Sequence, residues 1–517
     1  NYPNYGPLCE FSSDNIIDNN TPDDAGHVNT KVPFSPMFDE IFAWQDVTTE
    51  SQQDSPYYIW QYCYSNIAVA NQALKAIETL EADGTDMSAE RAEALICRAY
   101  NHFILVNVFC QAYKNANQSK NDIGIYYMTE PETTVKPQYD RGNVADVYAH
   151  IEEDLTAALP NISDTYYQVP KYHFNLKAAY AFAARFYLYK RDWDKVITYA
   201  DKVLGSSAAS AASLMFDADN CKRKGNIELE MYAWFDAKSN ANLHLQTTYS
   251  FALYSFVPSY CRYTFNRVPR DYTFLGSGPC WSDRFPGTNI WHYNQNYGGF
   301  LAKMYEPFEY TDKVAGIGYA HSLRREFTTG ETLLCRAEAK IMKGDLDGAV
   351  ADMDVWAKGY MCTKDLTEKN IKQFFYRGNS DRKAVQIRNA QLAPELHNSD
   401  MSSDWVISDD VRPFIWCVLH FRRLETMHDG LRWFDIKRYG IEIKHEIGYP
   451  VVTKTLTWND DRRAIQLPQE AIEAGQTANP RQVIGDNSTI VTSTASTTHN
   501  DLLLYTESMQ YPITILK

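Results

Sequence analysis

Apolar residues recur every three or four positions in several stretches of the chain, and this spacing predicts amphipathic helices. The clearest stretch is residues 331–358, where two apolar stripes flank the bend Lys343-Gly344-Asp345. The stripes comprise Leu333, Leu334, Ala337 and Ile341 before the bend, and Leu346, Ala349, Val350, Met353 and Trp356 after it. Gly344 suits the left-handed position that ends a helix, and Asp345 can cap the next helix. We therefore expect a helical hairpin here.

Elements of this hairpin recur elsewhere in the chain. Residues 95–99 (LICRA) nearly repeat residues 333–337 (LLCRA), and residues 192–194 (DWD) match residues 345–347 (DLD) in their offset from a small residue upstream. Further helical patterns cover residues 57–80, 143–159, 176–204 and 411–439. A single hairpin cannot bury its apolar face alone, so repeated hairpins predict a stack. The pairs resemble tetratricopeptide units, and we expect a mostly α fold built on about four of them.

The helical patterns divide the chain into five segments. A loop-rich N-terminal arm (1–56) precedes the first part of the helical-repeat scaffold (57–205). An irregular insertion (206–320), rich in Gly, Pro and aromatic residues, separates it from the rest of the scaffold (321–440) and a loop-rich C-terminal segment (441–517). Long irregular segments are usually functional. We expect one compact body in which the insertion carries the function.

The charge and composition exclude some classes of partner. A net charge of −15, without a Lys/Arg cluster, argues against a nucleic acid, whose phosphates would be repelled. The sequence has no run of 18 or more apolar residues that could span a membrane. The 36 tyrosines and 11 tryptophans suit contact surfaces, although a core that uses tyrosine explains them equally well.

The ten cysteines are scattered without a CxxC pair, and several fall within apolar helical patterns. Such thiols serve as small hydrophobic groups, so we interpret them mainly as free and buried. One disulfide within the insertion, between Cys261 and Cys280, remains open at this point. The spacing disfavours zinc.

No pattern of catalytic residues stands out. The acidic run 152–154 lies on a predicted helix, where a solvated face is a better explanation than paired catalytic carboxylates. Asp217, Asp219 and Glu228 imitate part of a calcium loop, but Lys222 occupies the position that requires glycine. HExxH, GxSxG and P-loop motifs are absent from the sequence. We predict no catalytic residue, metal site or cofactor.

Several blocks resemble the SusD/RagB family. The sharpest is residues 422–440 (RRLETMHDGLRWFDIKRYG), in which Glu425, Gly430, Arg432, Asp435 and Arg438 occupy the places of the family signature. Weaker blocks are residues 64–80, 92–109, 141–159, 178–204, 331–356 and 465–481, all in the order of the family. In this family the signature helix is structural. Arg432 and Asp435, three positions apart, are accordingly expected to form a structural charge pair.

The resemblance implies a location and a partner. Members of this family are lipid-anchored proteins on the surface of the outer membrane, and they capture nutrients for a TonB-dependent transporter of the SusC type. The lipid-bearing cysteine is expected at the mature N-terminus. This chain begins at Asn1, and Cys9 lacks a leader-like run before it, so we do not assign Cys9 that role.

The resemblance also places the ligand face on the loops before the first helix pair and on the long insertion. Trp and Tyr rings can stack on the apolar faces of sugars, while Asn, Asp and Arg can hydrogen-bond hydroxyl groups. The candidate ligand-binding residues are Trp44 and Asp46 from the first region, and Trp281, Asp283, Arg284, Trp291, Tyr293, Asn294 and Tyr297 from the insertion. For any one of these residues, packing of the insertion onto the helices is as good an explanation as ligand contact.

The resulting hypothesis is non-catalytic binding of an oligosaccharide or polysaccharide for delivery to the transporter. A peptide ligand is the nearest alternative within the family. A glycoside hydrolase acting through two carboxylates, or a scaffold that docks other proteins, are alternatives of a different class.

Overall fold

The computed structural model describes residues 2–482 except for 24, 49, 134–138, 257–260, 293–297, 305–307, 321 and 376–382. The described chain is mostly α-helical and contains twenty α-helices and five two-stranded antiparallel sheets. The predicted fold class is confirmed.

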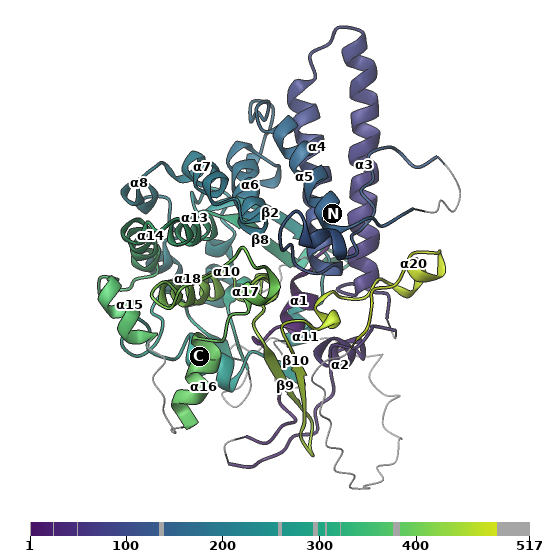
Figure 1. Cartoon of the computed structure of the whole chain (residues 1–517). Coiled ribbons are helices and arrows are strands. Elements are labelled where there is room, and N and C mark those ends of the chain that lie inside the picture. The colour runs from purple at the N-terminus through teal and green to yellow at the C-terminus, as the bar shows by residue number, and fades with distance from the viewer. Residues whose placement is uncertain are drawn as a thin grey trace.

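Four helix pairs form the scaffold. They are α3 (Pro56–Ala82) with α4 (Ser88–Phe109), α6 (Leu176–Lys190) with α7 (Trp193–Leu204), α13 (Thr329–Lys343) with α14 (Leu346–Gly359), and α18 (Arg412–Glu425) with α19 (Leu431–Tyr439). Helix α5 (Val144–Ala158) packs on α4, and α13 contacts α6, α7 and α18, so the pairs form one stack. Figure 1 shows α3 and α4 extending together well beyond the other helices.

The caps predicted from the sequence are present. Gly344 ends α13 with φ of 83°, and the Asp345 carboxylate accepts a hydrogen bond from the Gly348 amide at 3.0 Å. Each cap satisfies backbone groups that a helix end leaves without a partner. The bend between the two apolar stripes of residues 331–358 is therefore fixed by local chemistry.

The first part of the N-terminal arm, residues 3–19, lies mostly inside the molecule, whereas most of residues 25–32 are exposed. Helix α1 (Gly6–Ser12) is buried on every side and packs on α19, and α2 (Met37–Phe42) packs on α1. The strand β1 (Ile17–Asp18) pairs with β3 (Tyr263–Thr264) of the insertion. The arm thus joins the scaffold to the insertion.

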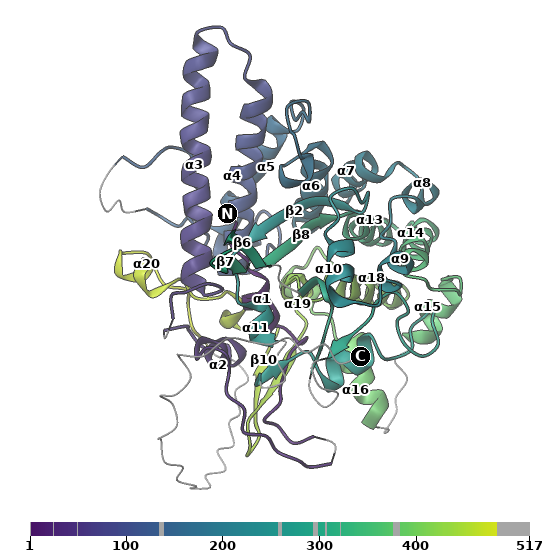
Figure 2. The same cartoon turned by 180° about the vertical axis from the view of Figure 1, so that it is seen from behind.

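The insertion and the C-terminal segment are built from short elements. Strand β2 (Asn242–Thr248) pairs with β8 (Ser322–Thr328), and Figure 2 shows this pair near the centre of the molecule, where both strands contact α6. The other strands are β4 (Trp291–His292), β5 (Gly299–Phe300), β6 (Phe308–Asp312), β7 (Ile317–Ala320), β9 (Ile443–Ile447) and β10 (Val452–Leu456). The other α-helices are α8 (Ala208–Ala212), α9 (Ala218–Lys222), α10 (Ile227–Trp234), α11 (Ala252–Phe256), α12 (Arg267–Thr273), α15 (Glu368–Phe374), α16 (Lys383–Leu392), α17 (Asn398–Met401) and α20 (Gln469–Glu473).

The charges of residues 422–440 pair differently from the expectation. Asp435 accepts from Arg422 at 3.0 Å and from Arg438 at 2.7 Å, whereas Arg432 reaches Asp14 of the N-terminal arm at 2.8 Å. The predicted pairing of Arg432 with Asp435 is wrong, because Asp435 faces α18 while Arg432 faces the arm. The structural role of these charges remains.

The cysteines are free thiols, and nine of the ten are buried, as predicted. The pairing of Cys261 with Cys280, which the sequence left open, does not occur. The Cys261 thiol donates to the Tyr254 carbonyl at 3.0 Å, and Cys280 instead lies beside Cys362.

Candidate functional site

A hollow of about 440 Å³ lies between the insertion and the turn that follows α14, and we call it the insertion hollow. It is lined by Leu275, Trp281, Ser282, Asp283, Arg284, Pro286, Met361, Thr363 and Lys364. The volume is in the range of small-molecule sites, and the lining combines apolar side chains with hydroxyl, carboxylate and cationic groups. Three residues predicted from the sequence, Trp281, Asp283 and Arg284, meet in this hollow.

Trp281 forms part of the hollow but is largely covered. Its ring is 6% exposed, its indole N–H donates to the Gly276 carbonyl at 2.9 Å, and it packs against Phe285 and the α18 residue Phe421. A Cβ at Gly278 would lie only 2.1 Å from the Trp281 ring. The loop can therefore hold this tryptophan only with glycine at position 278, and the ring offers the hollow little surface.

The polar groups of the hollow are more accessible. Asp283 and Arg284 are both exposed. The Lys364 ammonium donates to the Ser282 hydroxyl at 2.7 Å, which joins the two sides of the hollow. An exposed carboxylate, a guanidinium and an ammonium group can hydrogen-bond the hydroxyl groups of a bound molecule.

Trp291 does not line the hollow, but hydrogen bonds connect it to the wall. Its indole N–H donates to the Glu230 carboxylate at 2.8 Å, and Asn289 donates to the other oxygen at 2.6 Å. Asn289 also donates to the Lys222 carbonyl, and the Lys222 ammonium donates to the Pro286 carbonyl at 2.8 Å. Burial raises the pKa of Glu230, and its two donors oppose that rise. These bonds brace the loop that carries Asp283 and Arg284.

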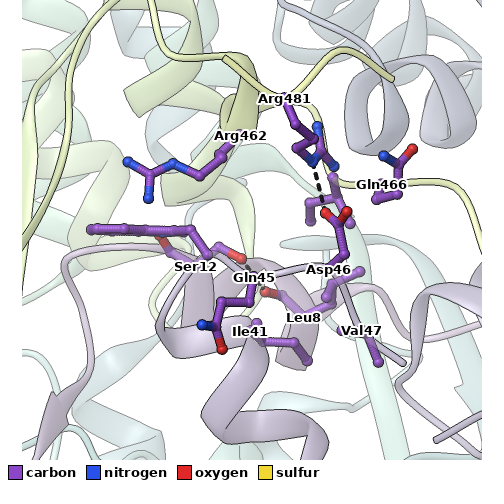
Figure 3. A pocket seen from close by; sticks show the side chains of 11 residues that line it. Leu8, Ser12, Ile41, Gln45, Asp46, Val47, Arg462, Gln466 and Arg481 are labelled. Carbon is purple, nitrogen blue, oxygen red and sulfur yellow. Dashed lines mark hydrogen bonds and ion pairs between the residues drawn. The ribbon is translucent and has the colours of Figure 1, made fainter. Parts of the chain in front are cut away.

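Trp44 and Asp46 lie at a separate cavity with a volume of only about 20 Å³, enough for roughly one water molecule. The Trp44 ring is 6% exposed, stacks on His445 with centroids 4.1 Å apart, and donates to the Ser12 carbonyl. Figure 3 shows Asp46 joined to Arg481 across this cavity, at 2.7 Å. This cavity has no space for a sugar ring, and none of its lining residues lines the insertion hollow.

The remaining candidates, Tyr293, Asn294 and Tyr297, lie outside the described residues. Ligand contact by any of the nine candidate residues stays a prediction.

Two features of the surface were not predicted from the sequence. The first is the turn after α14, whose residues Met361, Thr363 and Lys364 complete the insertion hollow although they belong to the scaffold. The second is a ladder of Tyr58 and Tyr62 on α3, with ring centroids 4.2 Å apart and Tyr62 36% exposed. Their spacing of four positions in a helix was the available signal.

The chain is similar to known protein families. Residues 15–188 match a family model described as "Starch-binding associating with outer membrane", and residues 255–513 match the model described as "SusD family". A SusD-like protein of Formosa agariphila is 23% identical over 431 residues, which are 80% of this chain and 77% of that protein.

Solved structures share the fold at low sequence identity. The crystal structure of a SusD-like carbohydrate binding protein from Bacteroides vulgatus has a TM-score of 0.56 and 14% identity, covering 91% of this chain and 90% of the other. A structure named as a laminarin binding SusD-like protein has a TM-score of 0.52 and 16% identity, covering 92% and 94%. The SusD family model matches residues 255–513, which make up half of this chain. The chain therefore belongs to the SusD family.

Proposed function

We propose that the protein binds a glycan without cleaving it, and that the insertion hollow contacts this glycan. The observation that carries the proposal is the composition of the hollow, where accessible Asp283, Arg284 and Lys364 surround apolar Leu275 and Pro286. Sugars present both apolar C–H faces and hydroxyl groups, so they require such a mixed surface. The carbohydrate-binding and laminarin-binding relatives support the choice of ligand class.

The same hollow favours binding over catalysis. Glycoside hydrolysis ordinarily needs two carboxyl groups on opposite sides of the scissile bond. Asp283 is the one carboxylate among the residues that line the insertion hollow in the described chain. The small N-terminal cavity likewise has one, Asp46, and it is held by Arg481. Binding without chemistry therefore suits these residues better than a hydrolase mechanism.

The family supplies the biological setting of the proposal. Its model description names association with the outer membrane, so we place the protein at the cell surface, held by a lipid anchor. Cys9 is completely buried in α1, which supports the view that the anchor is attached elsewhere. We further propose that the bound glycan passes to a TonB-dependent transporter of the SusC type. Co-purification with such a transporter from native membranes tests this step.

The binding proposal is tested by calorimetry against a panel of polysaccharides and peptides, with product analysis of the same samples. Asp283→Ala and Arg284→Ala should each weaken binding of the recognised glycan about tenfold or more, because a hydrogen bond to a charged group contributes roughly 1.5–3 kcal/mol. Both residues are exposed, so neither substitution should change the free energy of unfolding by much.

The matched control is the exposed pair Glu78 and Lys75 on α3, whose alanine variants should bind like wild type. Unchanged affinity in both hollow variants would show that the ligand does not bind in this hollow. If the wild type releases shorter products and Asp283→Ala does not, the protein is a hydrolase. If only peptides bind, the ligand is a peptide and not a glycan.

A further inference from the structure

Two cysteines lie against each other beneath the insertion hollow. Cys280 is in the insertion and Cys362 is in the turn after α14; they are 0% and 3% exposed. The two thiols are close enough to interact electrostatically, and Cys417 of α18 lies nearby. Both thiols are free in this structure.

The contact between the two segments does not depend on the cysteines alone. The Ser282 hydroxyl accepts from Lys364 at 2.7 Å, two positions beyond each cysteine. The rings of Phe285 and Tyr360 lie 5.3 Å apart, and a Cβ at Gly287 would come within 2.5 Å of Tyr360. The two segments are therefore in contact over several residues, as a disulfide between them needs.

We propose that Cys280 and Cys362 are a disulfide site, oxidised when the chain folds in an oxidising compartment. The two thiols lose two protons and two electrons, and one S–S bond forms between their sulfur atoms. A disulfide of the donor, either a thiol-oxidising protein or oxidised glutathione, accepts both electrons and both protons and becomes two thiols. Exchange of this kind proceeds through a mixed disulfide.

The timing of this reaction follows from burial. The neighbouring Cys362 thiol and desolvation both raise the pKa of Cys280 far above its ordinary value. The attacking thiolate must also reach the donor, and both sulfur atoms are buried, so the folded, reduced pair reacts slowly. Oxidation therefore precedes the docking of the insertion onto α14. Once formed, the bond joins one wall of the insertion hollow to the other, and its burial keeps other thiols from reaching and reducing it.

The test is thiol mapping of the full chain exported to a bacterial periplasm. Free thiols are alkylated in denaturant without reductant, and the digest is searched for cross-linked peptides. We expect eight of the ten cysteines to be alkylated, with the peptides of Cys280 and Cys362 joined. Cys261, a buried thiol that donates to a backbone carbonyl, is the internal control and should be alkylated. Alkylation of all ten, or a bond from Cys280 to Cys417, would overturn the proposal.

A second measurement does not depend on peptide recovery. Reductant should lower the Tm of the exported protein by several degrees, because the bond closes a long loop in the unfolded chain. The double variant Cys280→Ala/Cys362→Ala should show no such response. A Tm that reductant leaves unchanged in the wild type, or lowers equally in the double variant, would contradict the assignment.

Discussion

The carboxylate of Glu326 on β8 is buried among three side-chain donors, and its removal gives the sharpest stability prediction. One oxygen accepts from Arg185 at 2.6 Å and from the Tyr5 hydroxyl at 2.8 Å, while the other accepts from Arg324 at 2.9 Å. Burial acts to raise the pKa of this carboxyl, but Arg324 and Arg185 outweigh it and hold the pKa at about 2. Glu326 thereby joins the N-terminal arm, α6 and β8.

The pKa fixes both the size and the pH range of the effect. The difference from the ordinary glutamate pKa near 4.5 corresponds to about 3 kcal/mol of stability. Because the folded pKa is depressed, this contribution is complete above about pH 4.5 and is lost as the pH falls toward 2. Glu326→Gln should therefore lower the free energy of unfolding by about 3 kcal/mol at pH 7, and by progressively less below pH 4.5.

Urea unfolding of wild type and variant at pH 7, 5, 4 and 3 measures this convergence. The control is Glu152→Gln, which removes a partly exposed carboxylate that also has two lysine partners, Lys190 and Lys195. Because solvent screens these ion pairs, the control substitution should lower the free energy of unfolding by less than about 1 kcal/mol at pH 7. A Glu326→Gln loss that is the same at every pH, or no larger than the control, would refute the reasoning.

Two further predictions concern the hollow and the opposite pH dependence. Gly278→Ala should displace the Trp281 ring, destabilise the protein by about 3 kcal/mol and abolish retention in a glycan affinity gel. Gly316→Ala, in the turn between β6 and β7 with nothing within 4 Å, should cost about 1 kcal/mol and bind normally; equal behaviour of the two variants would contradict the model. Desolvation raises the pKa of Glu10 to about 7, so its contribution is present below about pH 4.5 and lost as the pH rises through 7. The free energy of unfolding of Glu10→Gln, measured in urea, should therefore rise by about 3 kcal/mol relative to wild type between pH 4.5 and 8. A difference between the two proteins that stays constant with pH would argue against a protonated Glu10.

The sequence predicted the helices that are long enough for their apolar spacing to repeat. The stripes of residues 331–358 and the caps at Gly344 and Asp345 are local signals, and the structure reproduces both. Helix α1 left no such signal, because its seven residues make only about two turns, too few for a repeating stripe. The partner of Arg432 was missed for a related reason, since Asp14 is distant in sequence and only tertiary packing brings the two together.

The candidate site was predictable only in part. Trp281, Asp283 and Arg284 are neighbours in sequence, so their grouping needed no tertiary information. The covering of the Trp281 ring was not visible, because it depends on Phe421 of α18 and on a backbone carbonyl. The second wall of the hollow, at Met361 and Lys364, comes from a turn whose sequence has no distinctive composition.

The family signature and the ligand site therefore report on different properties of the molecule. Within residues 422–440, Arg438 binds Glu338 of α13, and Lys437 donates to the carbonyls of Asn107 and Cys110 at the end of α4. These side chains tie the last helix pair to the others, and a ligand could not reach them because all are buried. Selection for the fold acts on such groups irrespective of the ligand. Under the function proposed above, the choice of glycan rests on exposed positions such as Asp283 and Arg284, which can change without disturbing the scaffold.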